Sequence, residues 1–248
     1  MDTEKVYNKN ASKWLRLAPS SLSDYTARPY VFKACGKLNG RSVLDIGCGE
    51  GYCARKLKHH GAGDYLGIDM SAKMIEVAKS QEATDLLGIE YRVCNVVEFV
   101  PERQFDICIA VFLFNYLRVS EMRHVFSMIY ETLPTQGRFI FCVPHPSFTF
   151  INTKKSPPFY FDSTGKNYFS DVDQQFEGEI WKRNGESLHV QYVHKKFSDY
   201  FECLKTSGFS HIPEVEELTV TPELVETDRK FFSPLLNKPL HVLFNVVK

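Results

Sequence analysis

In this 248-residue chain the apolar residues Val43 and Leu44 lead into Asp45 and Ile46, and three glycines follow at alternate positions, Gly47, Gly49 and Gly51. The pattern is typical of a buried strand that ends in a tight turn and opens a helix. Glycine allows unusual backbone angles and close approach of a ligand, and the amides that begin the helix attract a carboxylate or phosphate. The segment therefore predicts a ligand-binding loop.

A dinucleotide-binding loop requires the spacing G-x-G-x-x-G, whereas this loop has G-x-G-x-G. The carboxylate of Asp45 would repel a pyrophosphate but would favour a cationic ligand. The segment closely resembles the first motif of class I S-adenosylmethionine-dependent methyltransferases, in which this loop holds the amino-acid end of the cofactor. The resemblance implies that S-adenosylmethionine, and its product S-adenosylhomocysteine, contact Asp45, Gly47, Cys48, Gly49 and Gly51.

Strand and helix patterns alternate after residue 40, which indicates right-handed crossovers and a parallel sheet. The predicted strands are residues 42–46, 65–69, 89–94, 105–111 and 138–143, and the helices between them are 52–60, a helix capped by Ser71, and 120–133. A helix at 198–207 and strands at 212–220 and 241–247 follow. The resemblance implies a Rossmann-like α/β fold with a seven-stranded, mostly parallel sheet, helices on both faces and an antiparallel last strand.

The ends of the predicted strands carry the residues expected to bind the ligand, because open α/β sheets bind at their carboxyl edge. Asp69 ends the second strand and can accept hydrogen bonds from both hydroxyls of a ribose, or cap the following helix. Met70 would lie against the adenine. Asn95 stands where the family usually has an aspartate for the adenine amino group, and the Val96 amide is an alternative partner for the ring.

The fourth strand ends at Val111, and Val111 and Phe112 are expected beside the cofactor. Asn115 and Tyr116 follow and are predicted to contact the methyl acceptor. DNA amino-methyltransferases carry an Asn/Asp-Pro-Pro-aromatic motif at this place, and that motif is absent. The apolar loop is more typical of a small-molecule pocket.

The first 40 residues are expected to form a helical lid, as in related small-molecule methyltransferases. Tyr7 is predicted to contact the cofactor and Tyr25 the acceptor, although both also suit packing of a terminal helix on the sheet. Trp14 is expected to pack in the core. The chain is predicted to be one methyltransferase domain over residues 1–248.

Residues 144–197 interrupt the alternation with prolines and many aromatic residues, and they are predicted to form a cap with an extended pair near 179–193. Phe148 is expected to contact the acceptor. His145 follows the fifth strand between two prolines, and we predict it as a general base, since imidazole accepts a proton near neutral pH. The alternative is a histidine at the rim that only shapes the pocket.

The amino-acid composition of the chain limits the kinds of partner that it is expected to bind. Lysine plus arginine equals aspartate plus glutamate, 30 each, which argues against a dedicated nucleic-acid binder. No apolar run has membrane-spanning length, and the polar start of the chain is unlike a signal peptide. Seven scattered cysteines without a C-x-x-C pair suit reduced thiols in a cytoplasmic protein and give no metal site.

The leading interpretation is a methyltransferase that acts on a nitrogen or oxygen of a small molecule, as a monomer or homodimer. An RNA or protein methyltransferase of the same fold is the second, and a basic stripe of Lys154, Lys155, Lys195 and Lys196 would favour it. Asp45 and the spacing of the glycines argue against a third interpretation, a nicotinamide-dependent oxidoreductase. A non-catalytic relative that binds S-adenosylmethionine remains an alternative.

Overall fold

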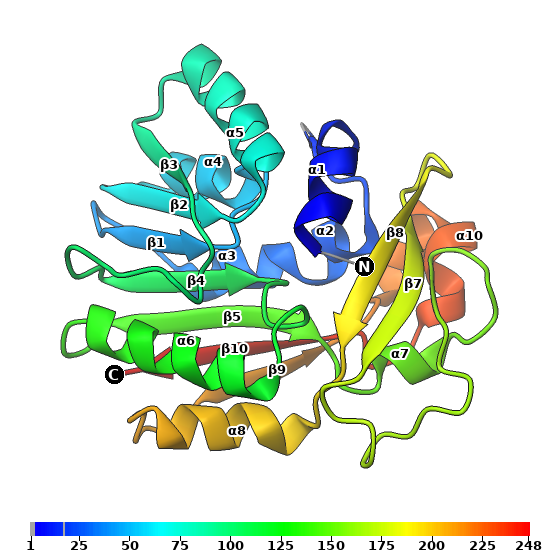
Figure 1. The fold of residues 1–248 in the computed structure, drawn as a ribbon. Helices are drawn as coiled ribbons and strands as arrows, with labels where there is room; N and C mark the ends of the chain where they lie inside the picture. The colour runs from blue at the N-terminus through cyan, green and yellow to red at the C-terminus, as the bar shows by residue number, and fades with distance from the viewer. Residues whose placement is uncertain (1–2, 17) are drawn as a thin grey trace.

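The computed structural model describes residues 3–16 and 18–248, and its centre is a seven-stranded sheet (Figure 1). The strands, in sheet order, are β3 (Ile89–Val93), β2 (Tyr65–Asp69), β1 (Val43–Ile46), β4 (Ile107–Val111), β5 (Arg138–Pro144), β10 (His241–Val247) and β9 (Glu214–Leu218). The five strands from β3 to β5 pair in parallel, and β10 pairs antiparallel with both of its neighbours. The predicted Rossmann-like sheet with an antiparallel last strand is confirmed.

The reversed direction of β10 has a consequence for the ligand edge. His241 begins β10 and lies opposite Pro144, the last residue of β5. The amino end of β10 therefore meets the carboxyl ends of the parallel strands, and residues from both ends of the chain reach one edge of the sheet.

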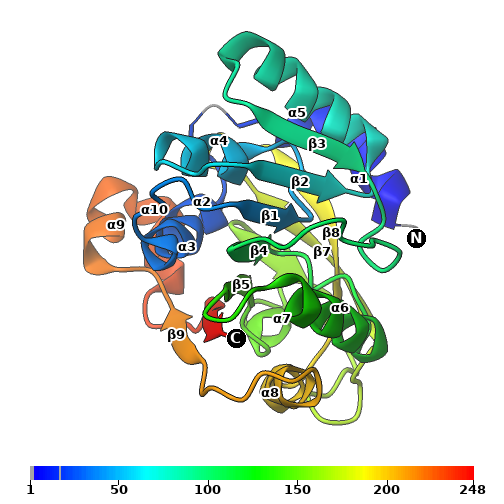
Figure 2. The ribbon, with the colours of Figure 1, turned by 90° about the vertical axis from the view of Figure 1, so that its left-hand side faces the viewer.

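Helices cover both faces of the sheet, as Figures 1 and 2 show. One core contains side chains of α6 (Val119–Thr132) and α8 (Phe197–Thr206), and the other contains side chains of α3 (Arg28–Cys35), α4 (Tyr52–His59) and α5 (Ala72–Asp85). The central strands divide their side chains between these two cores: Leu44 faces the first and Val43 the second. Burial on both faces explains why these strands are mostly apolar.

The strand bounds differ slightly from the predicted ones. The predicted strand 105–111 begins only at Ile107, because the backbone N–H of Phe105 donates to the Thr132 carbonyl, at the end of α6. The Asp106 carboxylate accepts from the backbone and hydroxyl of Ser42, 2.8 Å each, so it joins two strand starts instead of extending one.

The N-terminal segment is helical, with α1 (Thr3–Trp14) and α2 (Leu22–Thr26) before α3. Figure 1 shows α1 and α2 beside the carboxyl ends of the strands. Ser71 caps α5, as predicted, by accepting from the Met74 amide.

Residues 144–197 form a separate small sheet next to the same edge. It consists of β6 (Phe159–Phe161), β7 (Gln175–Trp181) and β8 (Ser187–Val193), preceded by the short helix α7 (Phe148–Ile151). The predicted extended pair is thus β7 and β8, while β6 was missed because it is short and follows two prolines. Lys13 and Lys182 join this small sheet to the end of α1 through a hydrogen bond.

Residues 219–240 contain elements that the pattern did not predict. They are α9 (Pro222–Thr227), α10 (Arg229–Phe232) and a 3-10 turn (Ser233–Leu235). Phe231, Phe232 and Leu235 pack in a third core together with Leu22 and Phe148. Among the described residues, no helix is long and apolar enough to cross a membrane.

Candidate functional site

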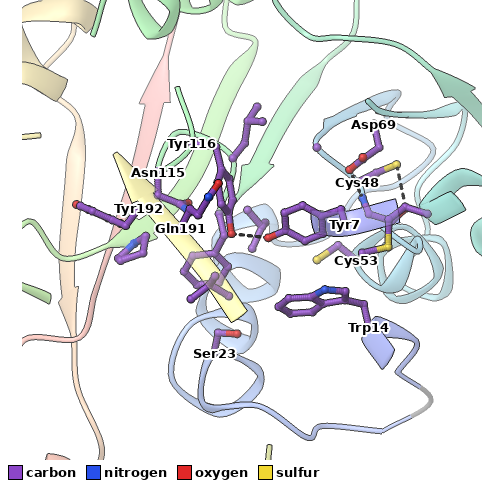
Figure 3. Close-up of a pocket in the computed structure, with 18 of the residues that line it drawn as sticks. Tyr7, Trp14, Ser23, Cys48, Cys53, Asp69, Asn115, Tyr116, Gln191 and Tyr192 are labelled. Atoms are coloured by element: carbon purple, nitrogen blue, oxygen red, sulfur yellow. Dashed lines mark hydrogen bonds between the residues drawn. The ribbon is translucent and has the colours of Figure 1, made fainter. Parts of the chain in front are cut away.

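One cavity of about 380 Å³ lies at the carboxyl edge of the main sheet (Figure 3). Its wall runs from the glycine loop to the small sheet of the insert. The predicted cofactor-binding region and the predicted acceptor-binding region therefore line the same cavity. Fourteen of the predicted residues line it: Tyr7, Asp45, Gly47, Cys48, Gly49, Asp69, Met70, Asn95, Val96, Val111, Phe112, Asn115, Tyr116 and Phe148.

The glycine loop adopts backbone angles that side chains disfavour. Gly47 and Gly49 have φ of 73° and 56°. A Cβ on Gly47 would lie 3.2 Å from Leu113, whereas open space surrounds Gly49. The loop thus exposes its backbone toward the cavity. Gly51 does not line the cavity; it has φ of 80°, and a Cβ there would collide with the Tyr91 hydroxyl. The third glycine therefore serves packing at the start of α4.

Asp69 holds the loop in place. One carboxylate oxygen accepts from the Gly49 amide at 2.9 Å, and the other accepts from the Ser71 amide at 2.8 Å. Each oxygen retains a further lone pair. Burial raises the pKa of Asp69, although both backbone hydrogen bonds oppose this shift. The two predicted roles, helix start and ligand contact, are therefore compatible.

Asp45 is buried below the loop, with 1% of its surface exposed. Its Oδ2 accepts from the Tyr65 hydroxyl at 3.0 Å. Burial raises the pKa of Asp45 to about 7, with a smaller contribution from the charge of Asp69. The carboxyl group thus changes charge near neutral pH, where a cationic ligand would favour its ionised form.

Asn95 lines the cavity while its Oδ1 accepts from the Val97 amide at 3.2 Å. Phe112 has φ of 63°, which is rare for an aromatic residue. Its backbone amide donates to the Cys142 carbonyl at 2.8 Å, and its ring lies under the Arg28 guanidinium. Unusual backbone of this kind concentrates at ligand sites.

A chain of buried ion pairs connects the N-terminal segment to the glycine loop. Asp24 contacts Arg28 at 2.9 Å and Arg16 at 3.2 Å, and Arg16 contacts Glu50 of the loop at 3.1 Å. Glu50 also pairs with Arg55 at 2.7 Å. The two arginines near Asp24 keep its pKa at about 2 despite burial. Removal of one partner from such a network leaves a buried charge unpaired, which is costly.

Tyr7 reaches across the cavity. Its hydroxyl hydrogen-bonds the Tyr116 hydroxyl, and the two rings meet edge to face with centroids 5.6 Å apart (Figure 3). Trp14 lies beside Tyr7, with ring centroids 5.5 Å apart. It lines the cavity and also packs against the third core, as the sequence suggested.

The insert supplies an aromatic and apolar wall. Phe148 stacks on Phe159 with centroids 3.9 Å apart, and Phe161, Ile180 and Val190 continue this surface. Two buried amides interrupt it. The side-chain oxygens of Asn115 and Gln191 have no hydrogen-bond partner within the described parts of the chain.

The structure does not bring His145 or Tyr25 to the cavity wall. The Ser147 amide donates to His145 Nδ1 at 3.1 Å, and His145 Nε2 lies 2.8 Å from Glu217. Both ring nitrogens are thus engaged by the protein, and the geometry gives the predicted base role no support. Tyr25 donates to the Pro19 carbonyl at 2.9 Å and packs on Phe232.

Several residues of the wall were missed by sequence reasoning. Arg16, Arg28, Gln191 and His241 all line the cavity. The buried Nε of Arg28 has no partner among the described residues. The direction of the last strand was the signal for His241, because an antiparallel strand starts at the ligand edge.

Comparisons with known proteins agree with this geometry. Residues 43–137 match the family described as a methyltransferase domain. The ubiquinone biosynthesis O-methyltransferase of Coxiella burnetii is 37% identical over 179 residues, which cover 71% of this chain and 63% of that protein. The chain spans 45 to 63% of the length of the first curated relatives that it matches.

Solved structures share the fold. An S-adenosylmethionine-dependent methyltransferase from Mesorhizobium loti superposes with a TM-score of 0.67 at 23% identity, over 89% of this chain and 96% of that one. The structure of DhpI in complex with S-adenosylmethionine superposes with a TM-score of 0.64 at 18% identity. The superposition covers 98% of this chain and 95% of DhpI. With its glycine loop, its sheet and the match of residues 43–137 to the methyltransferase domain, the chain is similar to the class I S-adenosylmethionine-dependent methyltransferases, whose fold it shares.

Proposed function

We propose that this chain transfers the methyl group of S-adenosylmethionine to a nitrogen or oxygen of a small, flat and largely apolar acceptor. The observation that carries the proposal is the single cavity that joins the glycine loop to the aromatic wall of the insert. Its volume of about 380 Å³ lies within the usual range for small-molecule sites, about 300–1,000 Å³.

The residues at the loop end suit the cofactor. Asp69 would accept from the ribose hydroxyls, and Met70, Asn95 and Val96 would surround the adenine. The Nε of Arg28, which has no hydrogen-bond partner in the described parts of the chain, offers a donor to a carboxylate. S-Adenosylmethionine, when bound, supplies a methyl group that its sulfonium has already activated.

The protein's contribution to the reaction is then to orient the acceptor and exclude water. Alignment of two reactants at near-attack distance is worth about 7–11 kcal/mol of a barrier in favourable cases. Tyr7 and Tyr116 narrow the middle of the cavity, and Phe148 and Phe159 offer a flat surface for a ring. The similarity to a ubiquinone biosynthesis O-methyltransferase supports a small-molecule acceptor.

The RNA or protein alternative loses its main support. Of the four lysines expected to form a basic stripe, Lys195 is buried, and Lys155 and Lys196 pair with Glu179 and Asp199. A polyanion would thus meet few free positive charges at this place.

Two measurements test the proposal. Calorimetry should show binding of S-adenosylhomocysteine and none of NAD; the reverse result would refute the assignment. Incubation with a methyl-labelled donor and a cell extract, separated into low-mass, RNA and protein fractions, should label the low-mass fraction. Label confined to RNA or protein would favour the second interpretation, and cofactor binding without any label would indicate a non-catalytic relative.

A further inference from the structure

His241 lies in the cavity wall between two aromatic rings. It is 3% exposed, and its ring centroid is 5.2 Å from that of Phe112 and 5.7 Å from that of Phe148. Phe112 follows the strand that ends at the cofactor side, and Phe148 belongs to the acceptor wall. The imidazole therefore lies where the two halves of the cavity meet.

Its tautomer is set by Thr26. The Thr26 hydroxyl donates its single proton to the Leu22 carbonyl at 2.9 Å. The same oxygen lies 3.2 Å from His241 Nδ1, so it is left to accept a proton from Nδ1–H. A neutral ring with its proton on Nδ1 carries a lone pair on Nε2. Thr26 also contacts the ring through its backbone, and within residues 3–16 and 18–248 the hydrogen bond with an assigned ring nitrogen is the one at Nδ1.

The surroundings keep this ring neutral. Burial lowers the pKa of His241 to about 3, and the positive charge of Arg28 contributes in the same direction. His145 is the other titratable group that acts on it. The lone pair on Nε2 is thus available throughout the physiological pH range.

We infer that His241 Nε2 accepts the proton of the methyl acceptor, and that this acceptor is a hydroxyl on a flat, uncharged ring. The inference rests on the proposed function and names its substrate class. As the new O–C bond forms and the S–C bond breaks, the sulfonium becomes a neutral thioether, and the hydroxyl proton passes to Nε2. Arg28 and burial disfavour the imidazolium, so that proton leaves to water when the product departs.

The aromatic rings around His241, together with its lowered pKa, favour an uncharged hydroxyl over a charged amine as the acceptor. A hydroxyl becomes strongly acidic once its oxygen is partly methylated, so a weak base suffices late in the transfer. An aliphatic amine enters as an ammonium ion without a lone pair, and a ring with a lowered pKa cannot remove that proton first. The apolar rings around His241 would also disfavour a charged amine.

The tautomer is tested without knowing the natural acceptor. In the complex with S-adenosylhomocysteine, 15N NMR should show His241 protonated on Nδ1 and not on Nε2 between about pH 5.5 and 8. Thr26→Val should allow the other tautomer to appear, while Thr26→Ser should retain the wild-type state. A proton on Nε2 in the wild type would overturn the inference.

Catechol and 1,2-dimethoxybenzene test the acceptor class, because the second keeps the flat ring and both oxygens, carries a methyl group on each oxygen and lacks both hydroxyl protons. Catechol, but not the ether, should shift the Nε2 resonance of the same complex. His241→Phe should lower catechol affinity about five- to tenfold, the worth of one hydrogen bond, and leave the ether unaffected. The surface variant His211→Phe is the control and should bind both like the wild type.

The acceptor assignment would be overturned if catechol binding did not saturate. It would also be overturned if the wild type and His241→Phe preferred catechol over the ether to the same extent. Binding of S-adenosylhomocysteine by every variant separates this inference from the proposed function. If the cofactor product does not bind the wild type, the proposed function fails; if it binds and the tautomer is wrong, only the role of His241 fails.

Discussion

At the scale of residues, two carboxyl groups at the ends of neighbouring strands play different parts. Asp69 is held by two backbone amides and is already oriented before any ligand arrives. Asp45 is held by one tyrosine hydroxyl, and burial keeps its pKa near neutrality. The first is suited to constant hydrogen bonding, and the second responds to the charge of a ligand.

Cofactor affinity should therefore depend on pH through Asp45. Below its pKa of about 7 the carboxyl group is protonated, and a cationic ligand must release that proton to gain an ionised partner. The affinity for S-adenosylmethionine should rise about fivefold between pH 6 and 7 and about twofold more up to pH 8, and then level off. Calorimetry at several pH values checks this. Asp45→Asn should bind weakly without the rise, and an unchanged rise in that variant would assign it to another group.

Asp69→Ala should lower the affinity for S-adenosylhomocysteine by at least about tenfold, because hydrogen bonds to a charged group contribute about 1.5–3 kcal/mol each. The variant also frees the Gly49 amide, so the loop should exchange its amide hydrogens faster. Glu98→Ala, on the exposed turn after Asn95, is the control and should bind normally. Wild-type affinity in Asp69→Ala would exclude the ribose contact.

At the scale of elements, the sequence predicted what local pattern determines. The apolar runs of β1 and β4 and the glycines between β1 and α4 carry their own signal, and so does the cap at Ser71. Helices α9 and α10 carry none, since their apolar side chains are fixed by a core that forms only with the insert.

The two histidines at the ligand edge also show how far the local sequence pattern can predict the site. His145 follows a parallel strand and was an obvious candidate, yet its ring turns to Ser147 and Glu217. His241 begins a strand, and only the antiparallel direction of β10 brings it to the cavity. Strand direction was predicted, but which side chain faces the cavity depends on contacts between distant segments.

Lys195, where the insert returns to the sheet, gives a prediction about an element. Its Nζ is buried and donates to the Val193 carbonyl at 2.9 Å, and Val193 in turn donates to the Asn115 carbonyl at 2.7 Å. Burial lowers the pKa of Lys195 from 10.5 to about 7. Between these values the unfolded chain binds more protons, so this lysine makes the folded state more stable as pH rises.

Lys195→Met removes that dependence. The unfolding free energy of the variant minus that of the wild type should fall as pH rises from 7 to 10, by at most about 1.4 kcal/mol per pH unit. Denaturant unfolding at matched pH values measures the difference. Lys196→Met, which removes a partly exposed neighbour, should show no such trend. A constant difference for Lys195→Met would mean that the buried amine stays protonated.

At the scale of the whole molecule, segments far apart in sequence close one cavity. The N-terminal helices, the insert and residues 219–240 share a core that is separate from the two cores of the sheet. Arg183, in the turn between β7 and β8, connects all three. Its backbone amide donates to the Ser20 carbonyl at 2.9 Å, and its guanidinium contacts Asp228 and the Tyr25 hydroxyl at 3.1 and 3.0 Å.

Arg183→Ala should loosen this enclosure without altering the glycine loop. The guanidinium also lies over the rings of Tyr25 and Phe232, at 5.4 and 6.0 Å, and an exposed contact of this kind is worth about 0.5–1 kcal/mol. Thermal unfolding should therefore shift by only about 2–4 °C. Amide exchange should rise in residues 20–26 and 222–235, while affinity for S-adenosylhomocysteine stays within about twofold of the wild type.

Arg183→Lys separates charge from shape. Lysine keeps the positive charge beside Asp228 but lacks the planar group that stacks on both rings and donates to Tyr25 in a fixed direction. If stacking and direction hold the three segments together, the lysine variant should exchange nearly as fast as the alanine variant; if charge suffices, it should match the wild type. Slow exchange in Arg183→Ala itself would show that the shared apolar core closes the cavity alone, because burial of Phe232 and Leu22 does not depend on the guanidinium.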